Sequence, residues 1–204
     1  MQQHERLEYG QFYHIYNHGV GGRNLFRSAE NYSYFLSLYE KYISEVAETF
    51  AWVLMPNHFH MLVRMKEETV VFIPDRVTNP VRDKNNVNIP SQQFSKLFNS
   101  YAQAFNKYYQ TRGALFERPF RRKLVTDTGY LRQLVLYIHN NPVRHGFCDH
   151  PLEYPWSSFL SCVEGKPTML KREAVLSWFD GKAGFEAMHQ HPGSTEQIHQ
   201  WITS

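Results

Sequence analysis

The stretch Phe50–Met65, FAWVLMPNHFHMLVRM, is the part of the sequence that decides the fold. Its two halves, FAWVLM and HFHMLVRM, are rich in aromatic, β-branched and other apolar residues, which is typical of β-strands. Pro56 and Asn57 separate the halves. Because proline donates no ladder hydrogen bond and asparagine favours turns, this break predicts a β-turn or a bulge between two strands.

The second of these strands places two histidines on one face. Residues two apart in a strand point to the same side of the sheet, so His58 and His60 share a face. The residues that point the other way are uniformly apolar: Phe59, Met61, Val63 and Met65. We expect the apolar face to pack against helices and the histidines to lie on the more open face, close enough to share one metal ion.

The spacing of the two histidines does not by itself establish a metal site. Eleven His among 204 residues give about 0.6 His-x-His pairs by chance, and a second pair, His189 and His191, lies in a polar tail. Two partly buried histidines that are held by hydrogen bonds are the alternative interpretation. A metal site would need at least a third ligand.

The order of elements predicts the fold class. Further strands are expected in 12–20 and within 112–125. Helices are expected over 29–47, from about Ser91, and over 129–141. Residues 126–128 would cap the last helix and Pro142 would stop it. The order is β-α-β-β-α-β-α. It predicts an α+β fold with an antiparallel sheet and helices packed on one face. Residues 66–90 lack periodicity and are predicted to form a long loop or insertion.

The helix predicted over 129–141 offers a candidate third ligand. Leu131, Leu134, Val135 and Ile138 form its apolar stripe at helical spacing. Tyr137 and Asn141 are four residues apart on another face, so a hydroxyl and an amide oxygen lie side by side. The alternative is that the tyrosine is a packing aromatic and the asparagine a C-terminal cap.

Composition narrows the function classes. A net charge of +3 and a pI near 8.8 allow a nucleic-acid partner only through a local basic patch. The two cysteines, Cys148 and Cys162, are too few for a disulfide scaffold and match no metal-ligand pattern. The first residues contain no apolar signal core, and no run of about 18 apolar residues occurs. A cytoplasmic protein with no membrane partner is expected.

A local basic patch is present ahead of the 129–141 helix. The patch consists of Arg112, Arg118, Arg121, Arg122 and Lys123, and Glu117 is the only acidic residue near it. Such a cluster suits contacts to DNA phosphates, which contribute affinity rather than sequence preference. The alternative is a solvated loop and strand edge.

Four motifs together carry a family resemblance. MPNHFHMLV, FERPFRRKLV, YIHNNPVRHGF and YPWSSF occur in this order between about Tyr13 and Phe159. The chain resembles the single-tyrosine HUH transposases and, within them, the REP-associated tyrosine transposase branch. The resemblance implies a ferredoxin-like antiparallel sheet over 1–165. It leaves 66–90 as an insertion and 166–204 as a short helical C-terminal appendage.

The resemblance also implies a site and a reaction. His58 and His60 would hold a divalent metal, Mg²⁺ or Mn²⁺, with Asn141 completing the site, and Tyr137 would be the nucleophile. The reaction would cut single-stranded DNA through a 5′-phosphotyrosine intermediate. The expected partners are hairpin-forming DNA repeats, and a homodimer is compatible with this superfamily.

Two other functions fit parts of the pattern. A zinc hydrolase that uses the histidines and a bound water would not need Tyr137, but the sequence offers no clear acidic ligand or glutamate base beside the pair. A domesticated protein that binds single-stranded nucleic acid without cleaving it would keep the fold. The intact set of histidines, tyrosine and asparagine disfavours this second alternative. No general base is identified, and His139 and His145 are expected to be structural or to contact phosphate.

Overall fold

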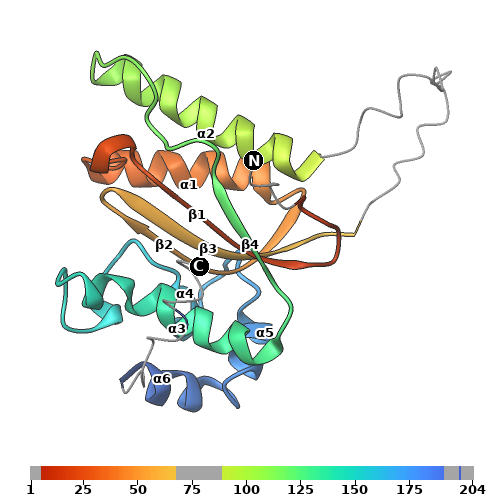
Figure 1. Cartoon of the computed structure of the whole chain (residues 1–204). Helices are drawn as coiled ribbons and strands as arrows, with labels where there is room; N and C mark the ends of the chain where they lie inside the picture. The colour runs from red at the N-terminus through yellow and green to blue at the C-terminus, as the bar shows by residue number, and fades with distance from the viewer. Residues whose placement is uncertain (1–5, 68–88, 191–197, 199–204) are drawn as a thin grey trace, which may run out of the picture.

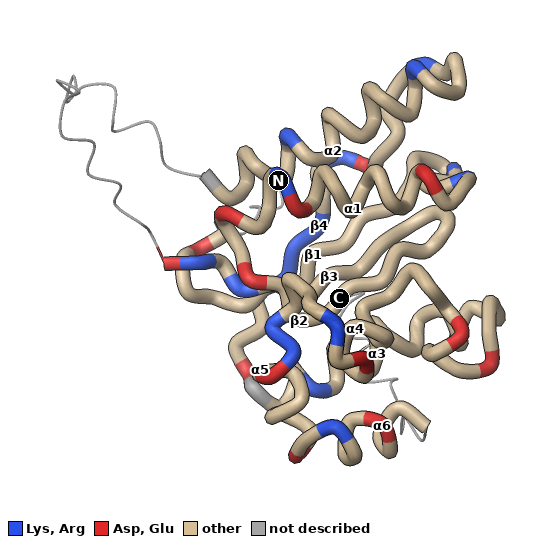
Figure 2. Tube along the Cα trace, turned by 180° about the vertical axis from the view of Figure 1, so that it is seen from behind, with Lys and Arg blue, Asp and Glu red and all other residues tan. Residues whose placement is uncertain are grey.

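Four antiparallel strands form the centre of the molecule. The computed structural model describes residues 6–67, 89–190 and 198. The strands are β1 (Phe12–His18), β2 (Ala47–Met55), β3 (His58–Met65) and β4 (Arg121–Val125), in the sheet order β2-β3-β1-β4. The predicted α+β class with an antiparallel sheet is confirmed. β4 forms one edge of the sheet and carries a run of Arg and Lys (Figure 2).

Helices cover both faces of the sheet (Figure 1). One face carries α1 (Ala29–Ile43) and α2 (Ile89–Tyr108), and the other carries α3 (Thr128–Arg144), α4 (Phe159–Val163), α5 (Arg172–Ser177) and α6 (Lys182–Gln190). Two 3₁₀ turns, Val20–Gly22 and Pro151–Glu153, complete the described elements. The prediction that helices pack on one face is correct for α1 and α2 and wrong for α3. The apolar stripe of α3 needs a second buried surface, and the other side of the sheet supplies it.

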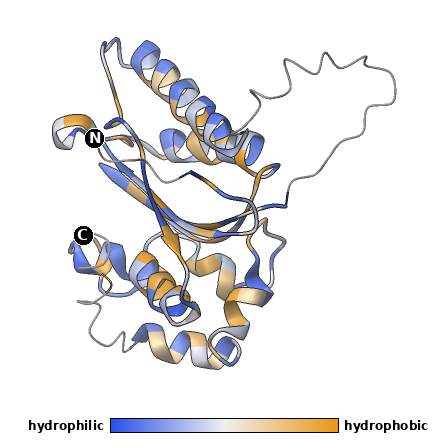
Figure 3. Cartoon of the chain, turned by 45° about the vertical axis from the view of Figure 1, so that its right-hand side comes forward, coloured by the Kyte–Doolittle hydropathy of each residue, from blue (hydrophilic) through white to orange (hydrophobic). Residues whose placement is uncertain are grey.

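Strand alternation sorts the side chains of β3 between two cores. Phe59, Met61 and Val63 are fully buried against α1 and α2, as predicted. Leu62 points the other way and packs in one cluster with Leu134 and Ile138 of α3. Hydrophobic residues accordingly occur on the helices at both faces of the sheet (Figure 3), and the buried ones form a cluster on each side. The histidine face is therefore covered, because α3 and the helices after it close over it.

The ends of α3 are fixed by local chemistry. The side chain of Asp127 accepts a hydrogen bond from the backbone N–H of Gly129 at 2.7 Å, as expected for an N-cap. Pro142 does not stop the helix, contrary to the prediction. It lies in the last turn, where its missing N–H costs one hydrogen bond, and the N–H of His145 still donates to Asn141. The helix ends before Gly146, which has a positive φ of 71°.

The edge of β2 is covered by later parts of the chain. The N–H of Leu54 donates to the carbonyl of Trp156, and the N–H of Ser158 donates to the carbonyl of Trp52, both at 2.9 Å. Further along the same edge, the N–H of Lys171 donates to the carbonyl of Thr49 at 2.8 Å. The YPWSSF motif thus pairs with the sheet, which gives it a structural role.

The C-terminal helices pack on the α3 side of the sheet. Phe179 and Phe185 are buried in the same cluster as α3 and β2. The division into 1–165 and 166–204 stays a prediction, and the expected loop over 66–90 falls, apart from its ends, outside the described residues. Within the described residues, no helix combines the length and the apolarity needed to cross a membrane.

A chain of buried polar groups joins α3 to α6. His139 Nδ1 lies 3.0 Å from His189 Nε2, and His139 Nε2 lies 2.8 Å from the hydroxyl of Ser158. His189 Nδ1 donates to the carbonyl of Phe185 at 2.7 Å, and Ser158 Oγ accepts the N–H of Trp52 at 2.8 Å. Every nitrogen of the two rings is hydrogen-bonded when both rings are neutral.

Acidification is expected to destabilise the protein through these two histidines. Burial lowers the pKa of His189 from 6.5 to about 4, and it lowers the pKa of His139 well below its ordinary value. As the pH falls below 6.5, the unfolded chain therefore binds protons before the folded chain does. The stability that depends on neutral His189 is complete above that pH and is lost as the pH falls toward 4.

This loss can be measured with one substitution. Urea unfolding at pH 7 and pH 5 should show that His189→Gln loses about 2 kcal/mol less stability over this interval than the wild type. Glutamine can hydrogen-bond at this position but does not titrate. Equal losses in the two proteins would show that His189 does not couple folding to pH.

Candidate functional site

A cavity of about 490 Å³ lies where β1, β3 and α3 meet. Strands contribute three of its histidines and one arginine, α3 contributes a tyrosine, and His145 directly follows α3. The lining side chains used below are Tyr16, His18, His58, His60, Arg121, Tyr137 and His145. The structure therefore brings both predicted histidines and the predicted tyrosine to one cavity, although they are almost eighty residues apart in sequence.

His58 contacts the predicted third ligand directly. Its Nε2 lies 3.0 Å from Oδ1 of Asn141, and its Nδ1 lies 2.8 Å from Oδ1 of Asn57. Burial lowers the pKa of His58 to about 4, although the hydrogen bond to Asn141 acts in the opposite direction. The imidazole is therefore neutral near pH 7, which is the form that binds metals.

His60 is held by a third histidine, His14 of β1. His14 Nε2 lies 3.0 Å from His60 Nδ1, and both side chains are buried. Burial lowers the pKa of His14 to about 3, with a smaller effect from Lys123, and burial also lowers the pKa of His60 well below its ordinary value. When His60 donates from Nδ1 to His14, the lone pair of its Nε2 remains for a ligand.

His14 is a residue that the sequence reasoning missed. The pattern that could have found it is the period of two in β1, which puts His14, Tyr16 and His18 on one face. The strand register then sets Tyr16 opposite His60 and His18 opposite His58. Periodicity alone does not give this register, because it depends on how β1 pairs with β3.

Tyr137 lies beside the histidines. Its side chain is 5% exposed, and its ring meets that of His60 edge-on, with centroids 5.3 Å apart and an interplanar angle of 81°. Burial raises the pKa of the Tyr137 phenol, while the positive charge of Arg144 and a hydrogen bond with Asn141 lower it. The guanidinium of Arg144 lies over the tyrosine ring, 5.4 Å from its centroid. The phenol is therefore protonated at neutral pH.

Two further histidines border the cavity. The ring of His18 stacks on His58, with centroids 5.1 Å apart, and the ring of His145 lies 5.2 Å from that of His58. Partial burial lowers the pKa of His18. His139 does not reach the cavity, since it is buried in the hydrogen-bonded chain with His189. Of the two roles expected for His139, structural or phosphate-contacting, its position agrees with the structural one.

The predicted basic cluster is divided by the sheet. In β4, Arg121 and Lys123 lie opposite Tyr16 and His14 on the histidine face, whereas Arg122 lies opposite Ile15 on the other face. Arg118 and Arg122 line a different cavity, beside α2, and Arg112 is exposed and lines neither. These residues were predicted to form one patch because the sequence pattern does not show at which residue β4 begins. Their contacts with DNA stay a prediction.

Two of the three predicted ligands, His58 and Asn141, lie at a spacing that one divalent metal ion could bridge. Two neighbouring ligands of an octahedral ion, each about 2.1 Å from it, lie about 3 Å apart. The 3.0 Å between His58 Nε2 and Asn141 Oδ1 matches this spacing, and neutral imidazoles with an amide oxygen suit ions such as Mn²⁺. Over 6–67, 89–190 and 198, no group of three His, Cys, Asp or Glu side chains could hold a metal. The candidate set thus depends on the amide of Asn141.

The chain is similar in sequence and in fold to known proteins. No protein-family model matches the chain. A Haemophilus influenzae protein named "Putative REP-associated tyrosine transposase" is 28% identical over 116 residues, which cover 55% of this chain and 58% of that protein. The solved structure described as a REP-associated tyrosine transposase bound to a REP hairpin superposes with a TM-score of 0.59. That protein is 18% identical to this chain, and the superposition covers 83% of this chain and 90% of the chain in the solved structure.

These two similarities concern sequence and fold separately. The match to the Haemophilus influenzae protein extends over little more than half of each chain, and the match to the solved structure concerns the fold. The resemblance predicted from the four sequence motifs is confirmed. The chain is thus similar in sequence to a protein named as a putative REP-associated tyrosine transposase, and it shares the fold of a solved REP-associated tyrosine transposase.

Proposed function

We propose that the protein is a metal-dependent transposase that cuts and rejoins single-stranded DNA through Tyr137. One observation carries the proposal. The side chain of Asn141 is hydrogen-bonded both to the phenol of Tyr137 and to His58. The ring of Tyr137 also contacts the ring of His60. A nucleophile and three candidate metal ligands thus lie in one buried cluster, of which Tyr137, His58 and His60 line the cavity.

The reaction that suits this cluster is transfer of a phosphoryl group. The phenolic oxygen of Tyr137 attacks the phosphorus of a phosphodiester after losing its proton, and the bond from phosphorus to the 3′ oxygen breaks. The products are a 5′-phosphotyrosine and a 3′-hydroxyl, which takes up a proton. Because the covalent link replaces one phosphodiester by another, a second 3′-hydroxyl can reverse the reaction and join a new strand without ATP.

Side chains at the cavity support this reaction electrostatically. Arg144 over the Tyr137 ring favours the phenolate, which counteracts part of the effect of burial. Arg121 lines the same cavity and can contact the phosphate. His58, His60 and Asn141 would hold a divalent ion, Mg²⁺ or Mn²⁺, which when bound polarises the scissile phosphate and stabilises the leaving oxygen.

The proposed substrate is a DNA hairpin with a single-stranded flank. Its support is the homologous solved structure, whose description names a REP hairpin as the bound DNA. Arg121 and Lys123 on the histidine face of β4 would contact the backbone next to the cleaved phosphate. A homodimer stays a prediction.

A zinc hydrolase fits the cavity less well. The described side chains that line it include histidines, Tyr137 and Arg121 but no carboxylate that could activate a water molecule. A protein that binds single-stranded nucleic acid without cleaving it remains the second candidate. The contact between Asn141 and His58 argues against it, because binding alone does not need this pair.

The test is a cleavage assay on labelled hairpin DNA that carries single-stranded flanks from genomic repeats. With Mg²⁺ or Mn²⁺, the 3′-labelled fragment should migrate with the protein on a denaturing gel, and the 5′-labelled fragment should be free and extendable by a polymerase. EDTA should abolish both products. Binding without cleavage on every repeat would instead support the non-cleaving alternative.

A further inference from the structure

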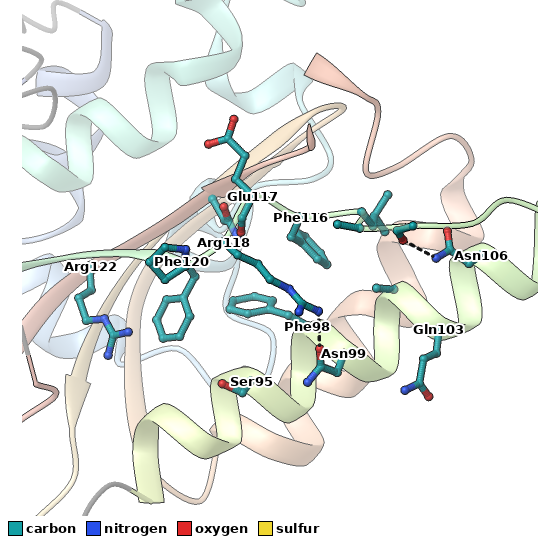
Figure 4. Close-up of a pocket in the computed structure, with 16 residues that line it drawn as sticks. Ser95, Phe98, Asn99, Gln103, Asn106, Phe116, Glu117, Arg118, Phe120 and Arg122 are labelled. Atoms are coloured by element: carbon teal, nitrogen blue, oxygen red, sulfur yellow. Dashed lines mark hydrogen bonds between the residues drawn. The ribbon is translucent and has the colours of Figure 1, made fainter. Parts of the chain in front are cut away.

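A second cavity lies on the opposite face of the sheet from Tyr137. It has a volume of about 600 Å³ and lies between α2 and the segment 113–122 that leads into β4 (Figure 4). α2 presents polar side chains to it at intervals of about one helical turn: Ser95, Asn99, Gln103 and Asn106. Its volume is in the range typical of small-molecule sites.

The polar side chains of α2 divide into two kinds. Asn106 is engaged within the protein, because it donates to the carbonyl of Gly113 at 3.0 Å and accepts from Thr111 at 2.8 Å. Asn99 accepts only a long bond of 3.4 Å from Arg118, and Gln103 makes no side-chain hydrogen bond with the part of the chain that the structure describes. Asn99, Gln103 and Arg118 are also exposed. They therefore offer donors and acceptors to a ligand.

The floor of this cavity is aromatic. Phe98, Phe116 and Phe120 are buried, and the ring of Phe98 lies 5.2 Å from that of Phe116 and 5.3 Å from that of Phe120. In Figure 4, the side chain of Arg118 extends past the ring of Phe98 toward Asn99 on α2. An aromatic floor with amide and guanidinium groups at its rim suits a nucleobase, whose face is apolar and whose edge hydrogen-bonds.

The two cavities lie back to back across the same two strands. On β1, Asn17 lines the second cavity and the next residue, His18, lines the cavity of Tyr137. On β4, Arg122 lines the second cavity and Arg121 lines the other. Since β4 is an edge strand, a DNA strand that passes around it can reach both faces of the sheet.

We propose that the second cavity binds an unpaired base of the DNA strand whose phosphate enters the Tyr137 site. Asn99 and Gln103 would contact the edge of the base, and Arg118 would contact its face or the adjoining phosphate. This inference rests on the proposed function, because it assigns the cavity to the same single-stranded substrate. The consequence is that base preference in the flank is set on the α2 side of the sheet.

The test compares DNA binding by the wild type and by the double variant Asn99→Ala, Gln103→Ala. Fluorescence anisotropy in EDTA measures affinity for fluorescein-labelled hairpins whose single-stranded flank is poly-dA, poly-dC, poly-dG, poly-dT or a run of abasic residues. The double variant should bind at least one homopolymer flank about tenfold more weakly than the wild type, and both should bind the abasic flank equally. Gln133→Ala, an exposed amide on α3, is the matched control and should bind like the wild type.

The outcomes separate this inference from the proposed function. Equal affinity of wild type and double variant for every flank would overturn the base site and leave cleavage at Tyr137 unaffected. Weaker binding of the abasic flank as well would also overturn it, because the loss would not depend on a base. If base-dependent binding is lost in the double variant but the wild type forms no covalent adduct, the base site stands and the proposed cleavage fails.

Discussion

Tyr137→Phe is expected to reduce formation of the covalent protein–DNA adduct by at least about a thousandfold. The substitution removes the one oxygen that would attack phosphorus. The phenyl ring keeps its place, because Tyr137 is buried and packs edge-on against His60. Folding and DNA binding should therefore be retained. The measurement is the fraction of 3′-labelled hairpin DNA that migrates with the protein on a denaturing gel.

Tyr130→Phe is the matched control for this substitution. Tyr130 lies two helical turns before Tyr137 on α3 but does not line the cavity, so its adduct yield should equal that of the wild type. Cleavage that persists in Tyr137→Phe would identify water as the nucleophile and favour the hydrolase. An adduct that carries the 5′ label would show that the polarity of the proposed link is wrong.

His60→Ala is expected to weaken binding of Mn²⁺ by more than about a hundredfold. Loss of a residue that only supports a metal ligand typically costs about 10–100-fold in affinity, and loss of a ligand costs more. His14→Gln should weaken Mn²⁺ binding by only about 10–100-fold, since it removes the ring beside His60 Nδ1 and leaves His58 and Asn141 in place. The amplitude of the electron paramagnetic resonance signal of free Mn²⁺ during a titration measures both affinities without any cleavage.

His150→Ala is the control for the metal titration. His150 contacts the backbone N–H of Leu152 and does not line the cavity of Tyr137, so Mn²⁺ affinity should not change. Unaltered Mn²⁺ binding by His60→Ala would place the ion elsewhere. Equal losses in His14→Gln and His60→Ala would mean that His14 is itself a ligand.

Local patterns were sufficient to predict much of the fold and the candidate site. Alternation in β3 predicted that His58 and His60 share a face, and helical spacing predicted that Tyr137 and Asn141 are neighbours. Each of these relations depends on one element only. The contact between Asn141 and His58 joins two elements, and the family resemblance rather than periodicity implied it.

Other features depend on contacts that are distant in sequence. The histidine face is buried because α3 and the helices after it close over the sheet, and no local pattern specifies that packing. Predicting the role of His14 would have required the register between β1 and β3. Predicting how the basic residues divide between the two faces would have required the first residue of β4. A shift of one residue would exchange Arg121 and Arg122 between the faces.

The two edges of the sheet are protected against other strands in different ways. An uncovered edge offers free N–H and C=O groups to which another chain can add, which promotes aggregation. At β2 the chain covers the edge itself, through Trp156, Ser158 and Lys171. At β4 the consecutive cations Arg121, Arg122 and Lys123 would repel the same edge of a second copy. Repulsion between like charges thus keeps the β4 edges of two copies from pairing, while the edge stays open to a polyanion.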